Sequence, residues 1–239
     1  MPAIRTQNSE SNNRTKTGIG NLTAAMYKTD PREAARYLGY HKVQPDETIS
    51  AMIDDCIAEV EDAAVPRSIH ERFPLLFSSD GTFQIASLHL HSRSLQWNLA
   101  GCSEVFLFAA TLGIAVDTLI KRAALMDSAK GAVMQAAAAA VIEAFCDEEN
   151  DKIRIEAESE GRYLRPRYSP GYGDLSLDCQ RDFLYLLKAQ KNIGLTVTDS
   201  GLMVPIKSVT AIIGISPDNS FCHRQGCEVC TKADCNFRR

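Results

Sequence analysis

The stretch that follows Asp127 constrains the fold most, because it predicts one long helix with an alanine-rich face. Asp127 or Ser128 is the expected cap, and the helix runs through Ala136–Ala140 and past Glu143. Alanine side chains form a smooth surface that packs closely against another backbone element. The polar segment 147–160 carries the same helix toward solvent. We therefore expect a second element to lie directly against this helix.

The remaining pattern mixes helices and strands. From the cap Asp46 to Pro66, apolar residues recur at helical spacing. Asp199-Ser200-Gly201 suits the turn of a hairpin between two short apolar runs. Further predicted elements are a strand over 83–90, a helix from Val116, a helix over 177–191 and a strand over 209–215. Because helices and strands do not alternate regularly, we expect an α+β fold: one domain with a mainly antiparallel sheet flanked by helices.

Three parts are expected along the chain. Residues 1–30 are rich in Asn, Thr, Ser and Lys and are predicted to form a disordered arm. Residues 31–220 form the folded domain, which at this length buries a substantial core. Residues 221–239 form a cysteine-rich tail.

Charge and hydropathy exclude several classes of function. The net charge of −4 does not favour binding to nucleic acid. The two most apolar windows, Val105–Leu119 and Ala132–Cys146, are interrupted by polar residues and fall short of the roughly 20 apolar residues of a membrane span. The N-terminus shows no cationic start followed by an apolar block, so no signal peptide is expected. These features predict a cytoplasmic protein that binds neither membrane nor nucleic acid.

The segment Arg165–Asp174, hereafter the Pro-Gly loop, carries the residues best suited to bind a ligand. Two prolines and two glycines make it rigid, and it brings Arg167, Tyr168 and Tyr172 together with backbone amides. A guanidinium matches a carboxylate, and a phenol ring can face a cation or stack on a planar base. The alternative is a structural loop in which Arg167 pairs with a nearby acid and the tyrosines fill a corner.

Glu143 is a second candidate, because it lies within an otherwise apolar stretch. Burying an unpaired carboxylate is costly, so this side chain should face a cation, a donor or solvent. A pairing with Arg167 that involves no ligand would satisfy the same requirement.

The Pro-Gly loop and a block downstream resemble the activation domain of vitamin B12-dependent methionine synthase. That family has an Arg-Pro-x-Pro-Gly-Tyr-Pro loop, a helix, and a Thr-x-Ser-x-x-Met-x-Pro hairpin. Here the loop is followed by LLKAQK at 186–191 and TDSGLMVP at 198–205. The resemblance is closest over 143–222, while the upstream segments 36–40 and 110–113 are similar to free-standing, single-domain members of the family.

The resemblance implies a site for S-adenosylmethionine. Arg167 corresponds to the family arginine that holds this ligand, within a loop that includes Pro170, Gly171 and Tyr172. Glu143 corresponds to a helical glutamate that lines the site.

Two further positions match the family less closely. Glu160 is the nearest equivalent of a second family glutamate, but it is offset by one position. Phe221 stands where the family has a tyrosine, so it retains the ring and lacks the hydroxyl.

The tail contains four closely spaced cysteines, in the pattern Cys222-x4-Cys227-x2-Cys230-x4-Cys235. Four thiols within fourteen residues suit tetrahedral ligation of zinc or of an iron–sulfur cluster. The spacing matches neither a standard zinc ribbon nor a common ferredoxin pattern, so the metal is not identified. Disulfides or unreactive thiols are the alternatives.

The resemblance therefore implies a reactivation subunit that binds S-adenosylmethionine and supports reductive methylation of cob(II)alamin. The cobalamin would be held by a corrinoid-dependent methionine synthase or another corrinoid protein, within a methyltransferase system of methionine biosynthesis. The electron would come from a flavodoxin- or ferredoxin-type reductant or from an iron–sulfur cluster in the tail. Two other interpretations stay open: a small zinc or iron–sulfur protein, and a non-catalytic adaptor that docks on a corrinoid protein.

Overall fold

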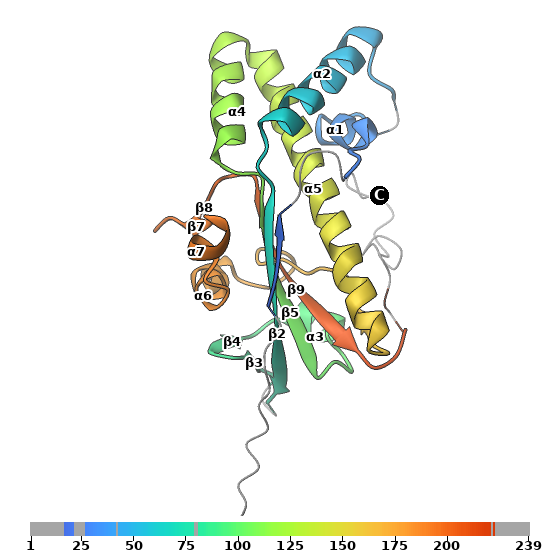
Figure 1. Cartoon of the computed structure of the whole chain (residues 1–239), viewed down its shortest axis with the longest axis vertical. Helices are drawn as coiled ribbons and strands as arrows, with labels where there is room; N and C mark the ends of the chain where they lie inside the picture. The colour runs from blue at the N-terminus through green and yellow to red at the C-terminus, as the bar shows by residue number, and fades with distance from the viewer. Residues whose placement is uncertain (1–16, 22–26, 42, 79–80, 221, 223–239) are drawn as a thin grey trace, which may run out of the picture.

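A computed structural model describes residues 17–21, 27–41, 43–78, 81–220 and 222, and it has an α+β fold (Figure 1). One antiparallel sheet is covered by helices on both faces, which confirms the predicted fold class. Four helices cover one face: α1 (Pro31–Tyr37), α2 (Glu47–Ala63), α4 (Ile114–Met126) and α5 (Ser128–Ser159).

The sheet has seven strands in the order β4-β3-β2-β5-β9-β6, with β1 also paired to β2. Every pairing is antiparallel. The strands are β1 (Thr17–Asn21), β2 (Arg67–Phe77), β3 (Phe83–Ile85), β4 (Leu88–Leu90), β5 (Glu104–Thr111), β6 (Tyr163–Leu164) and β9 (Ser208–Ser216). The short strand β6 therefore forms one edge of the sheet, next to β9.

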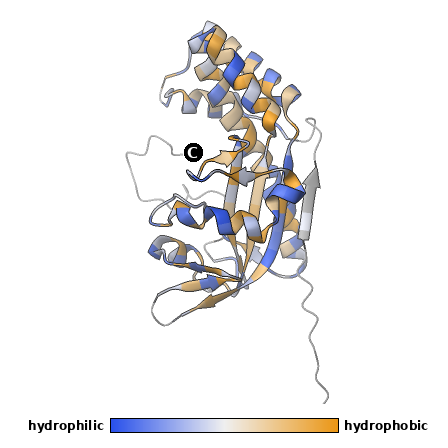
Figure 2. Cartoon of the chain, turned by 90° about the vertical axis from the view of Figure 1, so that its left-hand side faces the viewer, coloured by the Kyte–Doolittle hydropathy of each residue, from blue (hydrophilic) through white to orange (hydrophobic). Residues whose placement is uncertain are grey.

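The central strand β5 explains how the sheet separates two cores. Phe106 and Phe108 point to the helices α1, α2, α4 and α5, whereas Val105 and Leu107 point to the opposite face. Because side chains alternate along a strand, a sheet covered on both faces requires apolar residues at consecutive positions. Figure 2 shows these apolar residues concentrated on the central strands.

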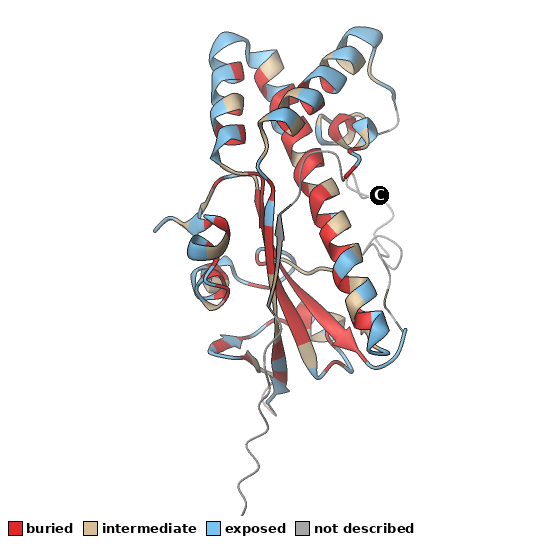
Figure 3. Cartoon of the chain, in the orientation of Figure 1, coloured by how far each residue is buried: buried red, intermediate tan, exposed pale blue. Residues whose placement is uncertain are grey.

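The long helix α5 is continuous over 32 residues, and Asp127 caps it by accepting from the amides of Ala129 and Lys130. Its alanine-rich face is buried, as predicted, against the sheet and the neighbouring helices (Figure 3). A Cβ on Gly131 would lie 2.6 Å from the Cα of Ala124, so α4 and α5 approach each other more closely there than a side chain allows.

Among the described residues, α5 is also the one helix long and apolar enough to cross a membrane. Within its most apolar window, 61% of the residues are buried inside the structure. That burial is typical of the core helix of a folded domain.

The second face of the sheet is covered by short elements. These are α3 (Arg93–Asn98), the 3₁₀ turn η1 (Leu177–Cys179), α6 (Gln180–Leu186), α7 (Ala189–Ile193) and the hairpin β7 (Thr196–Val197) with β8 (Met203–Val204). The predicted hairpin around Asp199-Ser200-Gly201 is thus confirmed, as is the helix capped by Asp46.

Two predicted elements are interrupted. The expected helix over 177–191 is observed as η1, α6 and α7, and the break between α6 and α7 lies at Lys188, which adopts a left-handed conformation with φ 48°. The expected strand over 83–90 is a hairpin of β3 and β4, and Ala86 between them has φ 50°. In both cases a single residue with positive φ, which sequence patterns rarely reveal, ends the element.

Strands β1 and β2 are among those that the sequence did not predict. Strand β2 was missed because His70, Glu71 and Arg72 interrupt its apolar pattern. Strand β1 lies within the segment 1–30 that was expected to be disordered, and it pairs through its backbone with β2 in the register Thr17↔Glu71. Tyr27 is also buried, so the folded part begins before residue 31.

Candidate functional site

The edge of the sheet positions the Pro-Gly loop. Beyond β6, the Arg165 amide donates to the Gly214 carbonyl at 2.8 Å. Tyr168 and Ile212 then exchange two backbone hydrogen bonds, at 3.0 and 2.8 Å. Arg167 lies between these two anchor points and is therefore held on an extended edge segment rather than on a free loop.

Arg167 forms a cluster with two acids of α5. Its Nη2 atom lies 3.0 Å from Oε2 of Glu143 and 2.7 Å from Oδ1 of Asp147. The two acids are four residues apart, which places them on the same face of the helix. The side chain of Arg167 is 15% exposed, that of Glu143 28% and that of Asp147 55%. The cluster is therefore half-buried, with Asp147 at its solvent side.

The structure thus brings together two residues that the sequence analysis selected, Arg167 and Glu143, and adds one that it missed. Asp147 could have been found from its position four residues after Glu143 on a predicted helix. Cys146 lies between the two acids in sequence but is fully buried. Burial raises the pKa of its thiol far above the usual range, so it stays a neutral core residue.

The Pro-Gly loop is fastened to α3 by Asp174. This carboxylate accepts from the Ser92 hydroxyl at 2.5 Å and from the Arg93 amide at 2.8 Å. These hydrogen bonds hold the pKa of Asp174 well below its usual range. The loop therefore stays docked on α3 while the carboxylate is ionised.

Close packing fixes the turn itself. Gly173 has φ 53°, and a Cβ there would lie 2.4 Å from the Tyr168 hydroxyl. That hydroxyl donates to the Tyr172 carbonyl at 3.2 Å. Pro170 is buried, and the amide of Gly171, which has φ 89°, donates to the Leu175 carbonyl at 2.9 Å.

The side chain of Tyr172 points outward from this rigid turn. It is 67% exposed, so the phenol ring does not fill a corner of the core. Its ring is therefore accessible to a molecule that approaches the loop.

Glu160 is not part of the cluster. It follows the last residue of α5, seventeen residues beyond Glu143, which at 1.5 Å per residue corresponds to roughly 25 Å. Its carboxylate lies 2.6 Å from Nη1 of Arg72, whose Nη2 also binds Glu104 at 2.5 Å. The structure thus gives Glu160 a role in joining the end of α5 to the sheet.

Most of the residues predicted to form a site in the tail lie outside the described part of the chain. Phe221, Cys227, Cys230 and Cys235 belong to that undescribed part. Cys222 is described: its Sγ lies 3.6 Å from the Asp218 carbonyl, and partial burial raises the pKa of its thiol. The described residues contain no group of three or more potential metal ligands, so the metal site stays a prediction.

The site is therefore a half-buried arginine held by two carboxylates at the edge of an antiparallel sheet, beside a rigid loop with an exposed aromatic ring. This arrangement places a guanidinium and two carboxylates together at the edge of the sheet of an α+β domain.

Comparison with known proteins places this domain in a family. Residues 100–227 match the model of the activation domain of vitamin B12 dependent methionine synthase. Because this match covers more than half of the chain, the chain belongs to that family. No match is found among the curated proteins.

The fold is similar to that of the MetH reactivation domain in its crystal structure bound to AdoHcy. The two structures align with a TM-score of 0.59 and 17% sequence identity, over 86% of this chain and 80% of the other. This similarity concerns the fold, and it extends beyond the segment matched by the family model.

Proposed function

We propose that this protein binds S-adenosylmethionine at the Arg167 cluster and presents its methyl group to a corrinoid held by a partner methionine synthase. Membership of the activation-domain family supports the proposal, as does the similarity to a reactivation domain bound to AdoHcy. The observation that carries it is the cluster of Arg167, Glu143 and Asp147 beside the Pro-Gly loop.

The charges of the cluster suit the amino-acid end of the ligand. A guanidinium has five N–H donors in a planar fork, so Arg167 can bind a ligand carboxylate while keeping contact with α5. Glu143 and Asp147 offer carboxylate oxygens to the ligand ammonium group, as in other charge-assisted hydrogen bonds. Because the arginine is already oriented by two acids, little ordering is required when the ligand binds.

The Pro-Gly loop suits the sulfonium end. The ring of Tyr172 can face the positive sulfur, an interaction that is strongest once water is excluded. The reduced corrinoid of the partner would supply the electron pair that takes the methyl group, and S-adenosylhomocysteine would leave. The protein itself would contribute orientation of the donor, which is catalysis by positioning.

Calorimetric titration with S-adenosylmethionine tests the binding step. We expect saturable binding by the full chain, and we expect Arg167→Ala to weaken it by about 1.5–3 kcal/mol, the scale of a hydrogen bond to a charged group. Arg122→Ala, which removes an exposed arginine of α4, is the matched control and should leave affinity unchanged. Absence of binding by the wild type, with the corrinoid protein present, would refute the proposal.

A reactivation assay tests the function. A cob(II)alamin-loaded methionine synthase that lacks its own activation domain is mixed with S-adenosylmethionine and a low-potential reductant. We expect the visible spectrum to show methylcobalamin forming faster when this protein is added. Equal recovery without it would favour the adaptor or the metal-protein interpretation.

We further propose that Cys222, Cys227, Cys230 and Cys235 bind one zinc ion or an iron–sulfur cluster, a proposal supported by their spacing. Elemental analysis of anaerobically purified protein should find near-stoichiometric zinc or iron. Cys227→Ser combined with Cys230→Ser should abolish it, whereas Cys56→Ser, in the buried core, should not. Full metal content in the double variant would exclude this ligation.

A further inference from the structure

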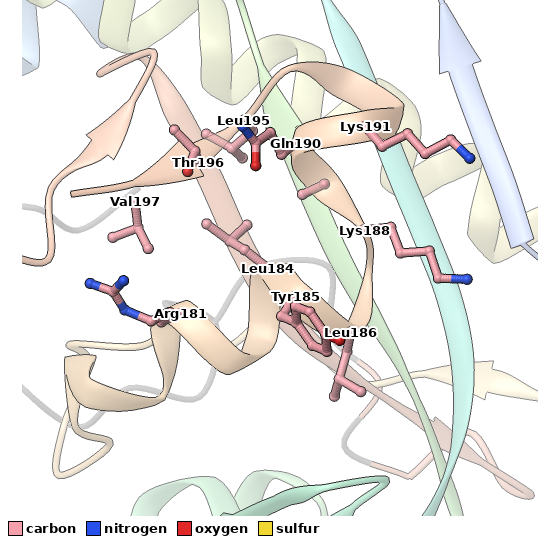
Figure 4. A pocket seen from close by; sticks show the side chains of 11 residues that line it. Arg181, Leu184, Tyr185, Leu186, Lys188, Gln190, Lys191, Leu195, Thr196 and Val197 are labelled. Atoms are coloured by element: carbon pink, nitrogen blue, oxygen red, sulfur yellow. The ribbon is translucent and has the colours of Figure 1, made fainter. Parts of the chain in front are cut away.

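A groove lies on the face of the sheet opposite α5, between α6, α7 and β7 (Figures 1 and 4). Its volume is about 640 Å³, in the range of ligand-binding pockets. The centre is apolar and is lined by Leu184, Tyr185, Leu195 and Val197. Tyr185 is 81% exposed, so the groove is open to solvent along one side.

Three cations border this apolar centre, and together they define what we call the basic groove. Figure 4 shows Arg181 on one side and Lys188 and Lys191 on the other. Arg181 binds Asp199 at 3.0 Å. Lys188 and Lys191 are exposed, and neither forms an ion pair within the part of the chain that the structure describes. This is a local concentration of positive charge on a chain whose net charge is −4.

The backbone conformation of Lys188 is a second, independent indication that this groove is a binding site. Its φ of 48° lies in the left-handed region, which costs a residue with a side chain more than it costs glycine. Residues held in such conformations cluster at binding sites and switch regions. Here the conformation ends α6, starts α7 and sets the lysine at the rim of the groove.

We propose that the basic groove binds an acidic segment of a partner protein. Carboxylates of the segment would pair with Lys188 and Lys191, and one apolar side chain would occupy the centre beside Leu184 and Leu195. The open side favours an extended segment over an enclosed small molecule. The groove and the Arg167 cluster lie on opposite faces of the sheet, so both can be occupied at once.

Fluorescence anisotropy with a defined probe tests the proposal. The probe is a fluorescein-labelled peptide Glu-Glu-Leu-Phe-Glu-Glu, titrated with the full chain at low salt. Replacing both rim lysines, Lys188→Gln with Lys191→Glu, should weaken binding about tenfold, because both charge pairs are lost. Lys121→Glu, on the exposed surface of α4, is the matched control and should change affinity less than twofold. No binding by the wild type, or an equal loss in the control, would overturn the proposal.

A second variant separates the side chain from the backbone. Lys188→Gly should raise the melting temperature, since glycine relieves the left-handed strain, and should still weaken peptide binding. Unchanged peptide affinity in this stabilised variant would contradict the role of Lys188.

Two further measurements test whether a second copy of the chain occupies the groove and whether the lysine variants affect S-adenosylmethionine binding. Sedimentation should show a monomer whose mass is unaffected by the double lysine variant; a dimer that the variant dissociates would overturn the proposal in favour of a second copy in the groove. S-adenosylmethionine titration of the same samples should be unchanged. A failure of the groove proposal can therefore be distinguished from a failure of the proposed function.

Discussion

Arg167 and the lysines of the basic groove present positive charge on opposite faces of one sheet, under different constraints. Arg167 is 15% exposed, bound by two carboxylates and carried on a segment paired to β9. Lys188, between α6 and α7, and Lys191, on α7, are exposed and have flexible side chains. A half-buried, oriented charge selects a ligand by geometry, whereas exposed charges act mainly through long-range attraction that salt screens.

The largest expected effect concerns the turn of the Pro-Gly loop, which follows Arg167 and packs against α3. Gly173→Ala should lower the free energy of unfolding by about 2–3 kcal/mol, because the new Cβ combines a positive φ with a clash against the Tyr168 hydroxyl. Urea denaturation measures this. Gly161→Ala, which also has positive φ but open space around it, is the control and should cost about 1 kcal/mol.

The same pair of variants sharpens the comparison between the two faces. Gly173→Ala should weaken S-adenosylmethionine binding and leave peptide binding at the basic groove unchanged. If both affinities fell together, the two faces would not be independent, and the contrast drawn between them would be wrong.

The next largest effect compares the contributions of Glu143 and Asp147, the two acids that bind Arg167, to S-adenosylmethionine affinity. Glu143→Gln should weaken S-adenosylmethionine binding by about 1–2 kcal/mol, and Asp147→Asn by less than about 1 kcal/mol, because Asp147 is the more exposed. Calorimetry on both variants gives the ranking. A larger loss for Asp147→Asn would show that the ligand binds at the solvent side of the cluster.

A pH dependence tests the attachment of the Pro-Gly loop to α3. The pKa of Asp174 is lower in the folded state than in the unfolded state, so the carboxylate stabilises the fold above its ordinary pKa of about 3.9. This stabilisation is lost as the pH falls below that value. The difference in unfolding free energy between wild type and Asp174→Asn should therefore shrink between about pH 4 and pH 2. A difference that stays constant over this range would remove Asp174 as the pH-sensitive anchor.

The smallest effect is expected at Glu160. Its ion pair with Arg72 is partly exposed, so Glu160→Ala should cost about 0–1 kcal/mol of stability. S-adenosylmethionine affinity should not change, since the residue lies roughly 25 Å along α5 from Glu143. A measurable loss of affinity would show that Glu160 contributes to ligand binding.

The sequence predicted the parts of the fold that depend on local signals. The cap at Asp127 and the alanine-rich face were sufficient for α5, and the turn Asp199-Ser200-Gly201 for the hairpin. Strand β2 was missed because its polar residues have partners that only the fold brings near, such as Glu104 and Glu160 for Arg72.

The candidate site shows the same difference between local sequence signals and contacts that only the fold creates. Arg167 and Glu143 were recognised from a motif and from a carboxylate in an apolar stretch, and they meet in the structure. Glu160 was selected as the nearest equivalent of a family glutamate that precedes the loop; it lies at the end of α5, far along the helix from Glu143, so its part in ligand binding stays a prediction. The break at Lys188, and with it the shape of the basic groove, depends on a backbone conformation that lysine seldom adopts.

The edge segment that carries Arg167 has a further consequence for solubility. It is the last strand-like segment of the sheet, and no other described segment pairs with its outer side. Such an edge invites a strand of another molecule to add to it. Pro166 offers no N–H there, and the neighbouring Arg167 carries a charge. The residues that shape the binding loop therefore also protect the sheet against edge-to-edge aggregation.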